Sequence, residues 1–320
     1  MIPRPSVLCP IDFSPGSRGA LRYAAVIAAH LGARLTVLAI DDPLLIEAAE
    51  FGDSPATVHK HAIQEMNKFC AATFADQQLT GADVQLKVVA GKPAAEILRV
   101  AHNDHCDLIV MGSHGATGFR KLFFGSTTER VLRETPVPVL VTPAADPGPV
   151  GPADVQRIIR RILVPVDLTT ATSHQLAVTV TVAEALSVPL LLLHVVEPVR
   201  SMVAAQPRQP KIDTERRSRA ERQLDKAAAD MPAVLRPEVL VAYGEPAEEI
   251  AKVAHDRDAG LIILGLHSSP VLGPRMGSVT YRVLCLAHRL VLALPPQPAP
   301  AVRFNPAEAA SHETAPTTTP

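Results

Sequence analysis

The sequence contains no tryptophan, and aromatic residues make up only 3% of its 320 residues. Proteins that bind single-stranded nucleic acids stack the bases on aromatic side chains, and this sequence offers no such platform. The formal net charge of −1 provides no field that would attract a nucleic acid or an acidic membrane. We therefore expect no nucleic-acid and no membrane partner, and hydrophobic cores made of alanine, valine, leucine and isoleucine.

Cysteines and long apolar runs are scarce as well. The four cysteines are scattered without the Cys-x-x-Cys spacing of zinc or redox sites, so we expect small core residues and no metal site. The sequence contains no stretch of about 18 apolar residues, which a transmembrane helix would need. The N-terminus also lacks the apolar segment of a signal peptide. These observations predict a cytoplasmic protein.

The chain contains two copies of one pattern. Four pairs of segments correspond: 7–14 with 162–169, 35–43 with 190–198, 91–97 with 244–250, and Gly125-Ser126 with Gly277-Ser278. The first pair shares an apolar run, a proline, an aspartate (Asp12 and Asp167) and a hydroxyl residue. A period of about half the chain indicates a duplicated domain rather than a solenoid of short repeats.

Each copy alternates short apolar runs with helical segments, which predicts an α/β fold with a parallel sheet and helices on its faces. In the first copy we expect strands at 6–11, 35–40, 84–89, 107–111 and 138–141, and helices at 17–30, from 54 onward, at 93–102 and at 126–134. The predicted domains are 1–145 and 157–297. A linker rich in proline and glycine at 146–156 joins them, a charged helix is expected near 213–230, and a disordered tail is expected at 298–320.

A glycine-spaced loop follows the apolar run 107–111. It reads Gly112-Ser113-His114-Gly115, and Gly125-Ser126-Thr127-Thr128 opens a helical stretch nine residues later. Glycine lets backbone amides approach a phosphate closely, and the first amides of a helix favour an anion. The pattern predicts a phosphate cradle at the carboxyl end of a strand, where ligands bind in open α/β sheets.

A purely structural interpretation of the loop is also open. Ser126 and Glu129 have the spacing of a capping box, in which Ser126 caps its own helix and Glu129 reaches back. The glycines would then be ordinary turn residues. Asp12 has a similar alternative, since it precedes a helix that it would cap.

The motifs of the first copy resemble the universal stress protein family, in a tandem two-domain form. The likeness rests on Pro10-Ile11-Asp12, on the Gly-x-x-Gly-x9-Gly-Ser pattern and on the strand 137–141 that follows. It implies Rossmann-like domains of the adenine nucleotide α-hydrolase type, each a five-stranded parallel sheet of order 3-2-1-4-5. It also implies that ATP, with Mg²⁺ as its default counterion, binds at the carboxyl ends of the strands.

The resemblance assigns roles to individual residues. Pro10, Ile11 and Asp12 would contact the nucleotide, with Asp12 at the adenine or ribose edge and Ile40 beside the base. The ribose and phosphates would lie against Met111, Gly112, His114 and Gly115, and donors to the phosphate chain would come from Gly125, Ser126, Thr127 and Thr128. Arg120 and Lys121 either neutralise phosphate charge or are simply solvated.

The second copy departs from this pattern. Asp167 and Gly265 are retained, but Ser268 replaces Gly115, and only eight residues separate it from Gly277. Pro270 and Pro274 stiffen that span. We therefore expect the first domain to bind ATP and the second to bind it weakly or not at all.

These observations predict an ATP-binding module of stress response or signalling. A slow ATPase and a nucleotide-free scaffold are the alternatives. The chain has no Gly-Lys-Ser/Thr phosphate loop and no general base beyond Asp12 and His114, so we assign no catalytic residue. In the resembled fold, the apolar runs 137–141 and 290–294 lie at sheet edges, and we expect them to pair within the chain, with a homodimer left open.

Overall fold

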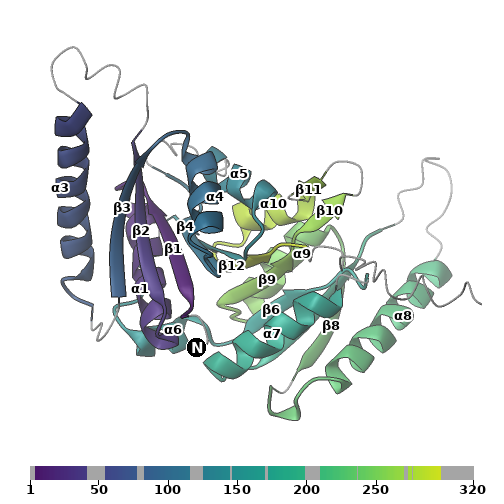
Figure 1. Cartoon of the computed structure of the whole chain (residues 1–320). Coiled ribbons are helices and arrows are strands. Elements are labelled where there is room, and N and C mark those ends of the chain that lie inside the picture. The colour runs from purple at the N-terminus through teal and green to yellow at the C-terminus, as the bar shows by residue number, and fades with distance from the viewer. Residues whose placement is uncertain are drawn as a thin grey trace, which may run out of the picture.

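The computed structural model describes residues 4–41, 55–77, 83–115, 125–144, 146–169, 172–198, 210–235, 237–269, 273–275 and 277–296. Ten strands form one sheet in the order β3-β2-β1-β4-β5-β12-β9-β6-β7-β8 (Figure 1). The strands are β1 (Ser6–Ile11), β2 (Arg34–Asp41), β3 (Asp83–Ala90), β4 (Leu108–Gly112), β5 (Val139–Thr142), β6 (Ile162–Pro165), β7 (Leu190–Val196), β8 (Glu238–Tyr243), β9 (Leu261–Gly265) and β12 (Leu290–Leu294). The predicted order 3-2-1-4-5 is confirmed in both halves of the chain.

Helices cover both faces of the sheet. The bounds are α1 (Pro15–Leu31), α3 (Pro55–Phe74), α4 (Pro93–Asn103), α5 (Ser126–Glu134), α6 (Pro152–Ile158), α7 (Thr172–Leu186), α8 (Pro210–Ala229), α9 (Pro246–Asp256) and α10 (Ser278–Leu286). One hydrophobic core lies beneath α1, α3, α6, α7 and α8, and a second lies beneath α4, α5, α9 and α10. Both cores consist mainly of alanine, valine, leucine and isoleucine.

The two halves join along one antiparallel pair of strands. β5 pairs with β12, with Val141, Leu140 and Val139 opposite Val291, Leu292 and Ala293, whereas the other neighbouring strands of this sheet are parallel. The expected pairing of the two edge runs is therefore seen within the chain. Because each run covers the open edge of the other, the seam satisfies backbone groups that a lone domain would expose.

Local sequence signals explain the helix ends of the first domain. Ser14 is the N-cap of α1, where its hydroxyl accepts a hydrogen bond from the Ser17 amide, and Gly32 ends the helix in the left-handed conformation that glycine favours. In α3, Met66, Phe69 and Thr73 recur every three or four residues and are buried, so they mark the face of the helix that packs on the protein.

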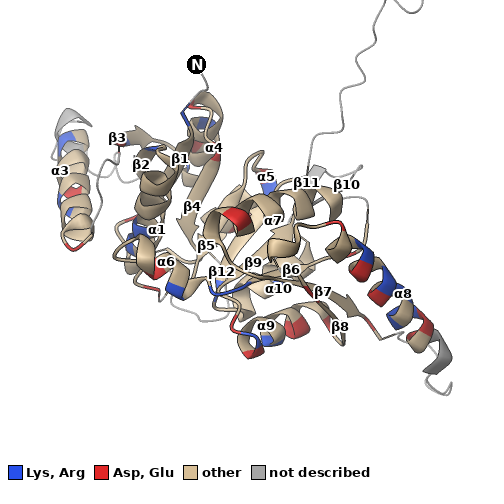
Figure 2. Cartoon of the chain, turned by 90° about the horizontal axis from the view of Figure 1, so that it is seen from below, with Lys and Arg blue, Asp and Glu red and all other residues tan. Residues whose placement is uncertain are grey.

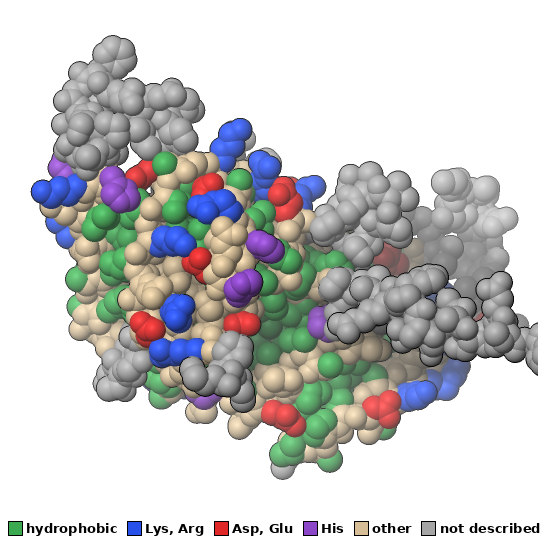
Figure 3. Space-filling model, in the orientation of Figure 1, with side chains coloured by type: hydrophobic (Ala, Val, Ile, Leu, Met, Phe, Trp, Pro, Cys, Tyr) green, Lys and Arg blue, Asp and Glu red, His purple; other side chains and the backbone are tan. Residues whose placement is uncertain are grey.

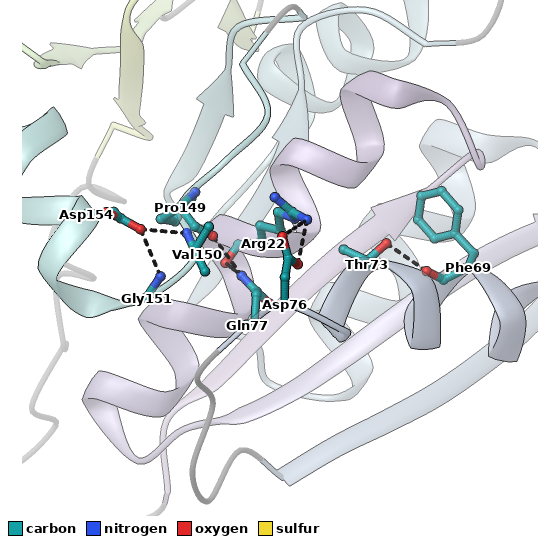
Figure 4. Close-up of polar contacts among 9 residues, drawn as sticks. All are labelled: Arg22, Phe69, Thr73, Asp76, Gln77, Pro149, Val150, Gly151 and Asp154. Atoms are coloured by element: carbon teal, nitrogen blue, oxygen red, sulfur yellow. Dashed lines mark hydrogen bonds and ion pairs between the residues drawn. The ribbon is translucent and has the colours of Figure 1, made fainter.

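The segment between the halves is bound to the first domain (Figure 4). Gln77 donates from Nε2 to the carbonyl of Pro149 at 2.9 Å, and Asp154 Oδ2 accepts from the amides of Val150 and Gly151 at 2.9 and 3.1 Å. The expected linker also contains part of α6. Proline and glycine thus shape a defined connection here, because neighbouring elements supply partners for its backbone groups.

Charged side chains are spread over the surface. Figure 2 shows acidic and basic residues interspersed along α8, which occupies the place of the expected charged helix. Figure 3 shows both signs mixed on the face seen in Figure 1, as the balanced composition implies. No helix among the described residues has both the length and the hydropathy to span a membrane.

Replacing Gly19 with alanine is expected to destabilise the protein, although alanine favours a helix interior by about 0.5–1 kcal/mol over glycine. A Cβ at Gly19 in α1 would lie 2.1 Å from the backbone oxygen of Asp146. The clash outweighs the gain in helix propensity, and we expect a net loss of about 1–3 kcal/mol in the free energy of unfolding, measured by urea denaturation. An increase in that free energy would show that the Asp146 segment yields freely.

Candidate nucleotide site at the carboxyl ends of the strands

The candidate site lies where the two central strands of the first domain diverge. β1 and β4 pair at Val7 with Leu108 and at Leu8 with Ile109, near their amino ends. The helix after β1 covers one face of the sheet, and the helix that follows the loop after β4 covers the other. In open α/β sheets this topological switch point forms the crevice that binds ligands.

Asp12 is exposed and directly follows the carboxyl end of β1. Its Oδ1 accepts hydrogen bonds from the Ser14 amide at 3.1 Å and from the Ser14 hydroxyl at 2.5 Å. Ser14, not Asp12, is the N-cap of α1, so the alternative role of Asp12 as the cap is wrong. Asp12 instead orients the residue that caps the helix.

The glycines of the motif permit close approach rather than unusual turns. A Cβ on Gly115 would lie 2.5 Å from Asp12 Oδ2, and a Cβ on Gly16 would lie 2.9 Å from the carbonyl oxygen of His114. A Cβ on Gly112 would meet the backbone of Gly16 at 3.2 Å. The start of α1 and the loop after β4 are therefore as close as they are because these positions lack side chains.

The helix α5 begins without a capping side chain. Its N-cap is Gly125, and Ser126 is the first helical residue. The capping-box alternative is therefore wrong, and Glu129 pairs with Arg133 one turn further on. The amides of the first helical turn have no side-chain acceptor at the cap, which is the arrangement that attracts an anion.

Two of the predicted phosphate donors have partners within the protein. The Gly125 amide donates to the Ser113 carbonyl at 3.0 Å, and the buried Thr128 hydroxyl donates to the Gly112 carbonyl at 2.9 Å. These bonds fix the start of α5 against the loop after β4. Ser126 is exposed and Thr127 is half-buried, and both lie in the first turn of the same helix.

The other predicted residues that the structure describes lie at or just after the carboxyl ends of β1, β2 and β4, and they differ in burial. Pro10, Ile11 and Met111 are buried in β1 and β4. Ile40 is half-buried near the end of β2, and burial raises the pKa of its neighbour Asp41, an effect that His59 opposes. The half-buried His114 has its Nδ1 3.0 Å from the Ser113 hydroxyl. Arg120 and Lys121 lie outside the described residues.

The second domain has a cavity of about 710 Å³ at the equivalent place. Asp167, Gln175, His194, Arg216 and Ser278 are among the residues that line it. Gln175 donates from Nε2 to the carbonyls of Pro165 and Ile263, at 2.9 and 2.8 Å, and so bridges the gap between β6 and β9. His194 places Nδ1 2.8 Å from the carbonyl oxygen of Val166.

Sequence reasoning missed both side chains that shape this cavity. In the alignment of the two copies, Gln175 takes the position of Ala20 and His194 that of Ala39. A comparison of the copies for small-to-polar replacements at buried positions would have found them. Together they place an amide and an imidazole where the first domain has two methyl groups.

The loop of the second domain also has a different form. Its residues make a hairpin of β10 (His267–Ser269) and β11 (Gly273–Arg275), in which Ser268 lies opposite Pro274. β11 contacts α5 of the first domain. The segment that would cradle phosphates in the second domain therefore packs on the helix that opens the candidate site of the first.

Comparison with known families identifies the family of this chain. The model of the universal stress protein family matches the chain twice, over residues 4–143 and 159–295. The chain belongs to the universal stress protein family. Both matches contain a complete five-stranded half of the sheet, so the protein is a tandem universal stress protein.

Individual relatives resemble parts or all of this universal stress protein. One from Methanocaldococcus jannaschii is 43% identical over 54 residues, which are 17% of this chain and only 33% of that protein. One from Thermus aquaticus is 35% identical over 129 residues, 39% of this chain and 91% of the relative. The structure of a universal stress protein from Archaeoglobus fulgidus covers 91% of this chain and 98% of its own, with a TM-score of 0.62 at 20% identity, a likeness of fold alone.

Proposed function

We propose that this universal stress protein binds ATP in its first domain and acts as a nucleotide-dependent module of stress response or signalling. The observation that carries the proposal is the approach of Gly115 to Asp12, where a Cβ would lie 2.5 Å from the carboxylate. The approach places the backbone of the glycine loop beside the carboxylate at the end of β1. Backbone amides beside a carboxylate suit a ligand that presents both hydroxyl groups and phosphates.

Each part of the site has a defined task in this proposal. Asp12 Oδ2 accepts from a ribose hydroxyl or from the adenine amine, while Oδ1 stays bound to Ser14. The amides of the first turn of α5 donate to the phosphate chain. Mg²⁺ would neutralise the triphosphate and keep most of its ligands from phosphate and water.

The second domain is proposed to bind ATP more weakly than the first. Its Gly115 equivalent is Ser268, which lies in the β10–β11 hairpin, and His194 and Gln175 project polar groups where the first domain has alanines. The cavity there has another set of donors and acceptors, so it does not reproduce the first site. Occupancy of the first site would bias the conformation of the pair only if ATP binds the two states differently.

Freshly purified protein is expected to release about one ATP per chain on denaturation, because the crevice of the first domain would retain a tightly held nucleotide through purification. Chromatography of the supernatant identifies and counts the nucleotide. Two nucleotides per chain would contradict the difference between the domains. No nucleotide, together with no heat of ATP binding in calorimetry, would reject the proposed function.

A further inference from the structure

We infer that a partly open cavity between the two domains is a binding site for a small, uncharged, apolar molecule. The cavity has a volume of about 340 Å³ and lies on the face of the sheet covered by α1, α6 and α7. β4 and β5 of the first domain and β9 and β12 of the second form its floor. It is separate from both carboxyl-end crevices, and domain interfaces are a common place for small-molecule sites.

The cavity is partly open to solvent, and its deeper lining belongs to the hydrophobic core. Leu261, Leu290 and Leu294 line it although they are only 3%, 2% and 2% exposed, and the same holds for Tyr23 and Val26 at 1% and 2%. Leu31, with 49% of its surface exposed, lies where the cavity opens between α1 and α7. An occupant of the cavity would therefore contact side chains of both domains.

The volume limits the size of that occupant. One turn of an α-helix about 10 Å wide and 5.4 Å long fills about 400 Å³, so a helix of a partner protein does not fit. An apolar cavity of about 150 Å³ binds benzene and otherwise stays dry. A cavity of 340 Å³ thus suits a molecule of about twice that size, such as a two-ring aromatic compound or a short aliphatic chain.

The lining also disfavours an anionic ligand. Among the lining residues, all of which the structure describes, there is no lysine and no arginine to pair with a carboxylate or phosphate. Two polar side chains in the lining already have hydrogen-bond partners within the protein. The Tyr23 hydroxyl donates to Asp146 at 2.9 Å, and Asp107 accepts from the Ser6 amide at 2.8 Å. His30 and Gln156 are exposed and so lie at the mouth.

Helix α7 supplies the second observation for an apolar occupant. Val178, Val182 and Leu186 recur every four residues, line the cavity and remain half-buried. A surface helix normally turns charged or polar residues outward, whereas this stripe faces the cavity without being fully covered by protein. A ligand would complete its burial and, by binding the folded protein alone, would raise the melting temperature.

The test uses the full chain and two fluorescent probes that differ by one charge. N-phenyl-1-naphthylamine is uncharged, and 8-anilinonaphthalene-1-sulfonate carries a sulfonate. We expect saturable binding of the uncharged probe at one site per chain, with a rise in melting temperature, and much weaker binding of the sulfonate. Equal binding of both probes would overturn the assignment of an uncharged ligand.

A pair of substitutions on α7 locates the probe. Ala185 lines the cavity and Ala177 lines a separate hollow on another side of the helix. Ala185→Trp is expected to abolish saturable binding and the thermal shift, and Ala177→Trp to leave both unchanged, with circular dichroism confirming that each variant is folded. Binding that survives Ala185→Trp, or that is lost in Ala177→Trp, would place the probe elsewhere and overturn the inference.

Two further outcomes would also reject the site. One is the absence of saturable probe binding by the wild-type chain, which would mark the cavity as an inert packing defect. The other is a wild-type dimer in analytical ultracentrifugation that Ala185→Trp converts to a monomer, because the mouth would then be an interface between copies. Neither outcome depends on ATP, so failure here is distinguishable from failure of the nucleotide site.

Discussion

Gly115→Val is expected to abolish ATP binding in the first domain while the protein stays folded. The added Cβ would lie 2.5 Å from Asp12 Oδ2, and valine adds two methyl groups beyond it. The carboxylate must move away from the position that its hydrogen bonds to Ser14 fix, and the valine side chain occupies the space between Asp12 and the loop after β4. We expect the dissociation constant for ATP to rise at least about 100-fold, or about 2.7 kcal/mol, in isothermal titration calorimetry.

Gly151 provides the matched control for this substitution. It is the N-cap of α6, a Cβ built there meets nothing within 4 Å, and its φ of −157° is extended backbone. Gly151→Val should therefore bind ATP like the wild type. A folded Gly115→Val protein with wild-type affinity would show that the nucleotide, if bound, does not use this crevice.

Val291→Asp is expected to have the largest effect on stability. Val291 lies in β12 opposite Val141 at the seam between the domains and is 1% exposed. A carboxylate there is buried without a partner, and its desolvation is not offset by hydrogen bonds or by an opposite charge. We expect a loss of more than about 4 kcal/mol in the free energy of unfolding, measured in urea.

The same substitution at an exposed valine controls for a general effect of an added charge. Val234 is 78% exposed, and Val234→Asp should change the free energy of unfolding by no more than about 0.5 kcal/mol. If both variants lost the same small amount, the seam would be open to water in solution. The two halves would then be held together chiefly by the chain that connects them.

The first residues of α1 and α5 show which structural features local sequence patterns predict correctly and which they do not. The Ser-x-x-Glu spacing at Ser126 and Glu129 fits a capping box, yet Gly125 is the cap and Glu129 pairs with Arg133. At α1 the hydroxyl residue Ser14 does cap the helix, and Asp12 supports it. The backbone conformation of the residue before the helix decides between such options, and that conformation depends on neighbours distant in sequence.

The sequence alone determined the duplication, the place of the glycine loop and, through the family likeness, the strand order. Apolar periodicity and repeated motifs are local properties, so they can be identified in the sequence without a structure. The tertiary structure alone decided which atoms meet across the chain. It brought Gly115 to Asp12, placed Gln175 between β6 and β9, and formed a cavity beneath α1, α6 and α7. These features depend on how separate elements pack against one another, and packing distances of a few ångströms leave no periodic trace in the sequence.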